Sequence, residues 1–445
     1  MKSVSWTKRH SKLLNLDLLH AKGESGVRYT VCIRKGFSTR AAGYAVDFGG
    51  GWDNYSLNGT KHRIPAGAAH FLEHVLFKPR GRNIADEISD RGGLANAETG
   101  YGSTLYYFSS VNAFRDNTVS LAEMCFPEKV DTDAVAQERG IVLAEHYEGL
   151  ESPFLAAILE LRRALLGDNN ASRDLSGTPD EIRAYDAEQL DELRRVFYSP
   201  SNVQFVATGD VDPDEFMNAV EERAASAEKL PRAKKNVLLS AHVEAEPVTI
   251  QHNVSRPLAV AGWRVRNTGE TAAQRRRYKL AVTIGIEALF GDTSDFYSAA
   301  IDNGYADDSL SHNVELSKPV GLVWLGTGCE RPQRFFDELE TARENCEQVL
   351  SKSERTLNSI RRRVMGKAVF ASSSVRGIRR LLLKPPRGKF PPKETAQDVL
   401  FDIGAEEVIR STADALAKTG WRGCLACRAE GLDSCFFWNS FAFAT

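Results

Sequence analysis

The chain has 445 residues, a length that predicts two or three domains, and its 42% hydrophobic content is enough for sizeable cores. A net charge of −2 argues against a nucleic-acid partner, and no apolar stretch reaches the roughly twenty residues of a membrane span. Seven cysteines, an odd number, and the lack of a secretory signal favour reduced thiols and a cytoplasmic location. The basic start is a weaker indication of an organellar transit peptide.

The first predicted elements are strands at residues 26–36 and 43–54, which are separated by turn residues. Helical periodicity follows at residues 66–77, with Pro65 well placed before or within the first turn. A second helix, at residues 84–93, ends in two glycines.

The chain then turns β-rich over residues 94–111, where Thr, Tyr and Phe cluster towards the end. Residues 130–152 are predicted to be helical, with Asp131 or Thr132 as the cap. Residues 201–225 have the pattern of a strand, a turn and a helix.

Charged and polar residues concentrate at 222–236, the best candidate for a linker. We therefore predict an N-terminal half at residues 1–228, a linker at 229–240 and a C-terminal half at 241–445. The second half opens with strands and continues with helices, so it repeats the character of the first.

A faint internal echo supports a duplicated α+β unit. Phe77 and Phe290 each precede a short predicted helix that ends in Asp-X-Gly, at Asp90 in the first copy and Asp302 in the second. The two phenylalanines are separated along the chain by nearly the same number of residues as the two aspartates. The second copy has Glu and Ala where the first has histidine, so only the first half carries the side chains of a metal site.

The chemistry of the first predicted helix lies in the sequence His70-Phe-Leu-Glu73-His74. Positions i and i+4 share a helix face, so both histidines can bind one ion. Glu73 lies beside them as a carboxylate that can move protons during hydrolysis. The alternative is two histidines that make ordinary hydrogen bonds in a half-buried helix.

A catalytic zinc needs three protein ligands and an open position. The predicted helix at residues 130–152 offers Glu138 and Glu145, which lie on one face about two turns apart. Either carboxylate could complete the ligand set.

Taken with their neighbours, these residues resemble the pitrilysin/insulinase zinc peptidases, which include the mitochondrial processing peptidases. The resemblance spans at least residues 60–215 and is closest to bacterial members that act as pairs of dissimilar subunits. It rests on several motifs in order: HFLEH, NAETGYGSTLYYFSS, ERGIVLAEH, GTPDEI and FYSPSNVQFVATGDVDP.

The resemblance implies that His70, His74 and Glu145 bind zinc and that Glu73 is the catalytic base. Glu138 would then orient a ligand histidine and raise its basicity. His146 points away from this face of the helix, so we expect it to be structural.

The resemblance also implies that Asn96 and Ala97 bind substrate on an edge strand, where an extended peptide can add itself to the sheet. A plain sheet strand fits the same sequence pattern.

Active members of the family supply an Arg and a Tyr from the second half, which support the developing oxyanion. Those positions fall here near Ile301 and Asp307, and neither residue can do this; Tyr297 and Tyr305 are nearby but out of step. We therefore expect a dissimilar partner subunit of the same family to supply both groups.

Two further features have less specific interpretations. Cys424, Cys427 and Cys435 alternate with apolar residues, which favours buried thiols over a redox or metal role. The segment 361–393 carries eleven basic residues and no acid. A solvated basic face is the plain interpretation, and a surface for an acidic peptide or partner is the sharper one.

Together these patterns predict an α+β protein with two homologous halves, each an antiparallel-rich sheet flanked by helices, closing like a clam around a peptidase chamber. The predicted function is that of a zinc-dependent endopeptidase for peptides or unfolded segments, including leader peptides, acting as the catalytic subunit of a heterodimer. The alternatives are a non-catalytic subunit for peptide binding or assembly, and a self-sufficient homodimer.

Overall fold

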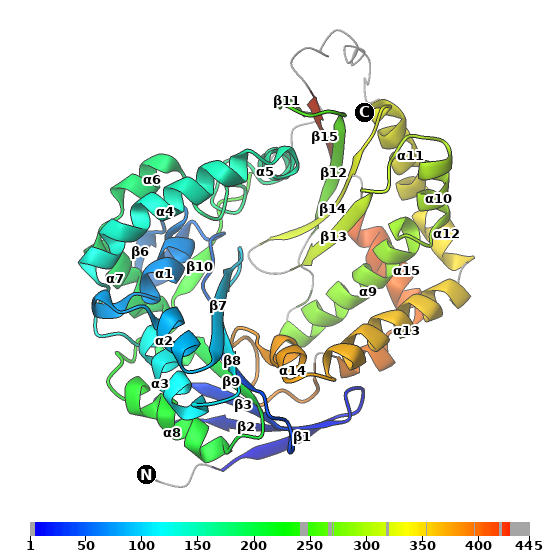
Figure 1. Cartoon of the computed structure of the whole chain (residues 1–445). Helices are drawn as coiled ribbons and strands as arrows, with labels where there is room; N and C mark the ends of the chain where they lie inside the picture. The colour runs from blue at the N-terminus through cyan, green and yellow to red at the C-terminus, as the bar shows by residue number, and fades with distance from the viewer. Residues whose placement is uncertain are drawn as a thin grey trace.

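The structure is a computed structural model. It describes residues 5–240, 248–265, 269, 271–316, 320–352, 354–395, 397–417 and 421–427. Two halves, each with a sheet and covering helices, form an open C in which the N-terminal half is blue to green and the C-terminal half green to red (Figure 1).

The N-terminal half is built on a seven-stranded sheet of order β1-β2-β3-β9-β4-β8-β7, in which the β3–β9 pair is parallel and the other pairs are antiparallel. Its strands are β1 (Thr7–Ser11), β2 (Leu16–Lys22), β3 (Arg28–Ile33), β4 (Arg40–Val46), β7 (Gly93–Thr99), β8 (Thr104–Ser110) and β9 (Val203–Gly209). A small second sheet has the order β10-β5-β6, with β5 (Asn54–Leu57), β6 (Thr60–Arg63) and β10 (Lys234–Asn236).

Helices cover this half and bury its core, where Tyr44, Phe71 and Phe205 belong to one apolar cluster. The helices are α1 (Ala68–Leu76), α2 (Ile84–Asp90), α3 (Phe114–Cys125), α4 (Thr132–Leu150), α5 (Pro153–Leu166), α6 (Pro179–Ala184), α7 (Ala187–Phe197) and α8 (Pro213–Ala224), with 3-10 turns at Pro79–Gly81 and Pro200–Asn202. The helix and strand predictions for residues 66–225 are thereby confirmed.

The C-terminal half is built on a five-stranded sheet of order β11-β15-β12-β14-β13, with a core around Trp263, Phe290 and Phe335. Its strands are β11 (Val248–Gln251), β12 (Leu258–Val265), β13 (Ser311–Leu316), β14 (Gly321–Gly328) and β15 (Trp421–Cys427). Its helices are α9 (Ala272–Phe290), α10 (Asp295–Asp302), α11 (Pro332–Glu344), α12 (Cys346–Ser351), α13 (Glu354–Ala371), α14 (Val375–Leu382) and α15 (Ala405–Ala415), with a 3-10 turn at Asp398–Phe401.

The second sheet repeats five strands of the first in order and direction. The strand series β11-β15-β12-β14-β13 corresponds to β3-β9-β4-β8-β7, and the first pair is parallel in both. The chain order α9-α10-β13-β14 likewise corresponds to α1-α2-β7-β8. The predicted α+β class with two related halves is therefore confirmed.

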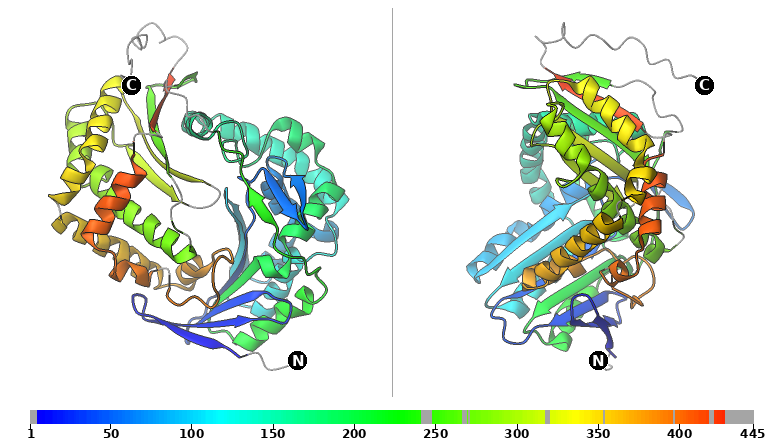
Figure 2. Two further views of the ribbon diagram at one scale, coloured as in Figure 1. Left: turned by 180° about the vertical axis from the view of Figure 1, so that it is seen from behind. Right: turned by 90° about the vertical axis from the view of Figure 1, so that its right-hand side faces the viewer.

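One helix from each half packs on the sheet of the other half. Helix α5 packs Leu161 and Leu165 on the second sheet, and its Arg162 Nη1 donates to Glu315 Oε2 at 2.7 Å. In return, α14 packs Ile378 on the first sheet, and both crossings are visible from opposite sides (Figures 1 and 2). The halves are interlocked rather than joined only by a linker.

The predicted linker at residues 229–240 is itself tied to the first half. Its Lys235 lies in β10 and contacts the buried Asp47, which also accepts from Arg232 at 2.8 Å. Arg387, from the second half, donates to the same carboxylate at 2.8 Å. Burial alone would raise the pKa of Asp47, but Lys235, Arg387 and Arg232 outweigh it and lower the pKa to about 2. The division at 228 and 240 stays a prediction.

The cysteines of the described chain are free and buried, at Cys32, Cys125, Cys329, Cys346 and Cys424. Cys424 lies in β15 as predicted for a buried strand. The side chain of Cys427, and Cys435 altogether, lie outside the described residues. Among the helices of the described part, none is both long and apolar enough to cross a membrane.

Candidate metal centre

Helix α1 begins at a close approach between two backbone segments. Gly67, its N-cap, has φ 85°, and a Cβ on it would lie 2.1 Å from the backbone oxygen of Ser176. Gly177 faces it with φ 93°, and a Cβ there would lie 2.3 Å from Ala66 O. Only glycine fits both positions, so the start of α1 is fixed against residues 176–177.

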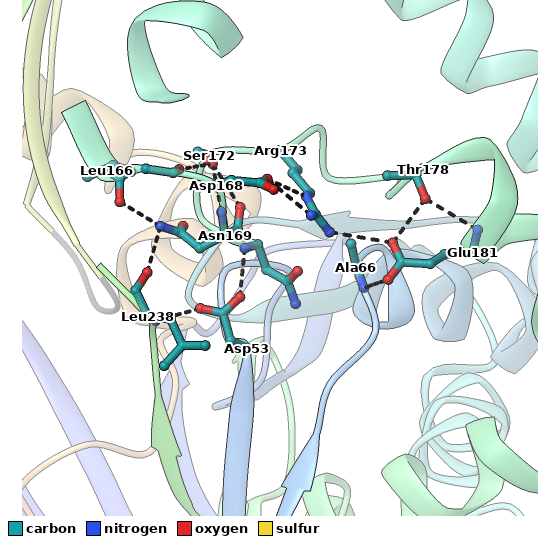
Figure 3. Close-up of polar contacts among 12 residues, drawn as sticks. Asp53, Ala66, Leu166, Asp168, Asn169, Ser172, Arg173, Thr178, Glu181 and Leu238 are labelled. Atoms are coloured by element: carbon teal, nitrogen blue, oxygen red, sulfur yellow. Dashed lines mark hydrogen bonds and ion pairs between the residues drawn. The ribbon is translucent and has the colours of Figure 1, made fainter. Parts of the chain in front are cut away.

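The GTPDEI motif anchors the same point. Thr178 caps α6, and Glu181, three residues on, accepts from Thr178 Oγ1 at 3.1 Å and from the backbone N of Ala66 at 3.2 Å (Figure 3). Tyr185 donates to Ala66 O at 2.5 Å. The motif therefore positions α1, a role that its sequence alone did not reveal.

The loop before α6 is held just as firmly. Asp53, at the start of the small sheet, accepts from the backbone N of Leu238 at 2.6 Å, and Asn169 donates to the carbonyls of Leu166 and Leu238 (Figure 3). These contacts fix the segment on which the glycine approach depends.

Helix α1 has one polar face. Ala68, Ala69, Phe71, Leu72, Val75 and Leu76 are buried in the core. His70, Glu73 and His74 lie on the remaining, half-buried face, and the two imidazole centroids are 4.7 Å apart. The 3.6-residue period places these three side chains together, as predicted.

Helix α4 crosses this face and brings Glu145 to the histidines. It is capped by Asp131, whose side chain accepts from the backbone N of Asp133 and Ala134. Glu145 Oε2 lies 3.3 Å from His74 Nε2 and 3.7 Å from His70 Nε2. Among the described residues, these three side chains form a group whose ligand atoms all lie within 4.8 Å of one another.

These distances fit a metal ion. Two ligand atoms held at about 2.1 Å from one tetrahedral zinc would lie about 3.4 Å apart. Glu145 is also 53% exposed, so the open side of the cluster faces solvent. The cluster is compatible with zinc and leaves room for a further ligand.

Glu138 lies behind the cluster, nearly fully buried. Its Oε2 is 3.0 Å from His74 Nδ1, and its Oε1 pairs with Lys78 Nζ. A carboxylate can only accept here, so Nδ1 carries the proton and Nε2 is free for a ligand bond. Sequence reasoning missed Lys78, which lies just beyond the end of α1.

Glu73 is oriented by the neighbouring sheet edge. Thr99, the last residue of β7, donates its hydroxyl to Glu73 Oε2. Burial, together with Glu145 and Glu98, raises the pKa of Glu73 although Thr99 and His74 act in the opposite direction. Sequence reasoning did not single out Thr99, which lies inside the predicted strand.

The His70 imidazole is in the form that binds metal. Burial and the neighbouring His74 lower the pKa of His70 to about 4, so this ring is neutral at neutral pH. His70 Nδ1 is buried and has no hydrogen-bond partner among the described residues. A neutral imidazole offers a lone pair to a metal.

Strand β7 lies at the edge of its sheet and, in the described part of the chain, pairs with β8 alone. Asn96 is exposed, and its Oδ1 accepts from the backbone N of Ala97 at 2.7 Å. Ala97 is buried towards α1. The edge position is as predicted; the substrate-binding role of these two residues stays a prediction.

The remaining predicted residues lie outside the cluster. His146 is buried, with Nδ1 2.8 Å from Ser176 Oγ, which agrees with a structural role. In the second half, Ile301 is exposed, and Asp307 accepts from Arg256 Nη1 at 3.0 Å. Tyr305 is buried in the core.

The second half has an ion-pair cluster where the first has its histidines. Glu287, near the end of α9, lies 3.2 Å from His312 Nε2 on β13 and pairs with Arg363 on α13. A guanidinium neutralises the carboxylate from the helix side, and cations of this kind do not bind metals.

Fold and site together define a class: a two-halved α+β protein that carries the side chains of a His-His-Glu metal site. Family models agree with it. Residues 56–179 match the model described as Insulinase (Peptidase family M16), and residues 184–359 match that of the Peptidase M16 inactive domain. The two matches together span more than half of the chain, which belongs to peptidase family M16.

Individual relatives support the same conclusion. An uncharacterized zinc protease of Bacillus subtilis (strain 168), YmfH, is 24% identical over 336 residues, which are 74% of this chain and 78% of the relative. The mitochondrial-processing peptidase subunit beta of Dictyostelium discoideum is 27% identical over 177 residues, 38% of each chain. An M16-like peptidase structure from Alicyclobacillus acidocaldarius has the same fold, with a TM-score of 0.81, 22% identity and coverage of 96% of this chain and 99% of that one.

Proposed function

We propose that this chain is a zinc-dependent peptidase that hydrolyses peptide bonds in extended peptides or unfolded segments. The observation that carries the proposal is the convergence of His70, His74 and Glu145, with Glu73 beside them. Zinc, held by the first three side chains, would supply a Lewis acid for the scissile carbonyl and for water.

The residues of the chain have separable roles in this proposal. Glu73 accepts a proton from the attacking water and later delivers it to the leaving amine, and the Thr99 hydroxyl holds its carboxylate in place. Glu138 keeps His74 in the tautomer that presents Nε2 and makes this ligand more basic.

Substrate would bind by adding a strand to β7. The free edge of β7 offers backbone N–H and C=O groups, and its end at Thr99 contacts the proposed base. Main-chain pairing by Asn96 and Ala97 would read an extended conformation with little demand on sequence, which suits peptides and leader segments.

The oxyanion donors would come from a second, dissimilar M16 chain. Ile301 has no polar group, and Asp307 is an anion already bound to Arg256 and Ser309. Neither can stabilise developing negative charge. The proposal therefore makes this chain the catalytic subunit of a heterodimer, active only weakly alone.

The test is zinc content and cleavage of a quenched peptide library, with the chain alone and with a second M16 chain of the same organism. We expect about one zinc per chain and activity that appears with the partner. Glu73→Gln should retain zinc and lose activity by about 10²- to 10⁴-fold. Zinc binding without cleavage under either condition would favour the alternative of a peptide-binding or assembly subunit.

A further inference from the structure

A group of cations without acidic partners lies on the two helices near the face of the first sheet to which Glu98 of β7 points. Its members are Arg276 and Lys279 on α9, Arg380 on α14, and Lys384 just after α14; they are called the α9–α14 basic cluster below. Within the described part of the chain, none of the four forms an ion pair or a side-chain hydrogen bond. Arg380 and Lys384 belong to the basic segment 361–393. By contrast, Arg363 and Arg387 of that segment are paired with acids, so the segment is not uniformly a solvated face.

Contacts place α14, which carries part of this cluster, on the inner face of the first sheet. Arg379 of α14 lies 3.6 Å over the ring of Tyr107 in β8, and the Tyr107 hydroxyl donates to Glu98 Oε1 of β7 at 2.6 Å. The start of α9 lies against the loop that follows α14, since a Cβ on Gly388 would lie 3.0 Å from Ala272 Cβ. Both helices lie by the sheet at the base of the C (Figures 1 and 2).

The strand register shows which side chains share this face. Asn96 pairs with Tyr107, and Glu98 pairs with Leu105. Paired residues of antiparallel strands point to the same side, so Asn96 and Glu98 face α14. A peptide added to β7 would lie about 4.8 Å further out and would present every second side chain to the same side.

The charges on this face do not balance. Glu98 keeps its charge, because its partner Tyr107 is a neutral donor, whereas Glu315, which attracts Lys279, is bonded to Arg162 at 2.7 Å. Glu394 attracts Arg276. Desolvation and the repulsion from Lys279 and Arg380 outweigh the attraction of Glu98 and lower the pKa of Lys384. An anion would relieve that repulsion.

We propose that the α9–α14 basic cluster selects peptides that carry Asp or Glu on the side of the bound strand that faces α14. The proposal rests on the proposed function, because it assumes that peptides bind along β7. It adds a substrate class, namely acidic peptide segments. Residues of the second half would recognise these segments, whereas the catalytic side chains lie on the first half. Selection of this kind is electrostatic and therefore weakens with salt.

The experiment measures peptide binding to the Glu73→Gln chain by fluorescence anisotropy, so that cleavage is not needed. Two extended peptides with a neutral dye are compared, one with Glu at alternate positions and one with Gln at the same positions. We expect tighter binding of the Glu peptide at 50 mM salt and loss of most of this preference at 300 mM. Lys279→Gln and Lys384→Gln should each weaken Glu-peptide binding by about 2- to 5-fold and leave Gln-peptide binding unchanged.

A control variant removes two exposed lysines elsewhere, Lys61→Gln with Lys352→Gln, and should keep the preference. Reversal of two charges in the double variant Lys279→Glu, Lys384→Glu should shift the preference to a Lys-containing peptide. An unchanged Tm would show that this variant is folded. Equal binding of the Glu and Gln peptides, or equal losses for both in the lysine variants, would overturn the proposal.

The outcomes separate this proposal from the catalytic one. A preference for the Glu peptide without cleavage by the zinc-loaded wild-type chain, alone or with its partner, would leave the basic cluster standing and remove the peptidase assignment. Cleavage without that preference would refute the basic cluster alone. Absence of binding to any peptide would refute both.

Discussion

Glu138→Gln tests separately the two contacts of the carboxylate behind the His-His-Glu cluster. Glu138 is nearly fully buried and contacts both His74 Nδ1 and Lys78 Nζ. The amide keeps the volume and can still accept from Nδ1, but it removes the charge. Lys78, whose side chain is 28% exposed, then loses its acidic partner.

Two effects of different size follow. Loss of the partner of Lys78 should destabilise the metal-free chain by about 2 kcal/mol, which is a shift in Tm of several degrees for a half of this size. A less basic His74 should weaken zinc binding by about 10-fold, the lower end for such a change. At saturating zinc this removes a further ~1.4 kcal/mol of stabilisation.

The assays are thermal unfolding with and without zinc, and zinc competition against a chelator of known affinity. Adding Lys78→Met to Glu138→Gln should restore the Tm of the metal-free chain, because the unpaired ammonium is gone, but not the zinc affinity. If the double variant binds zinc as tightly as the wild type, Glu138 acts through Lys78 rather than through His74. If Glu138→Gln does not change the metal-free Tm, the buried ion pair contributes no stability.

Two further predictions concern the fold around the site. Asp47→Ala should lower the free energy of unfolding by about 3 kcal/mol, measured in denaturant, because it leaves three cations around an empty position. The pKa of Asp47 is lowered to about 2, so the stability that its ion pairs contribute is fully present above its ordinary pKa of 3.8. This contribution is lost as the pH falls through about 2. A free energy of unfolding of the wild type that does not change over this pH interval would contradict the prediction. Gly67→Ala should lower both Tm and zinc affinity, because the new Cβ would lie 2.1 Å from Ser176 O at a φ of 85°. The control Gly59→Ala, where φ is also positive but the space around the new Cβ is open, should lower Tm alone. Unchanged zinc affinity in Gly67→Ala would show that the start of α1 does not set the ligand geometry.

Local periodicity determined much of the site. Because side chains four residues apart share a helix face, His70 and His74 could be paired from the sequence, and Glu73 beside them needed no tertiary information. The same holds for the helices at residues 66–77 and 130–152, for the cap at Asp131, and for the echo between the halves, which the repeated strand order bears out.

Tertiary packing decided which distant groups meet. Whether Glu138 or Glu145 reaches the open side of the histidines depends on how α4 crosses α1, and His74 and Glu138 are 64 residues apart in the chain. The contacts of Glu73 with Thr99 and of Ala66 with Glu181 likewise join separate elements, as does the exchange of α5 and α14 between the halves. Periodicity sets which face of an element is polar, but the partner of that face depends on packing among elements far apart in sequence. The sequence by itself therefore determined the elements and the chemistry they carry, and only the tertiary structure decided their partners.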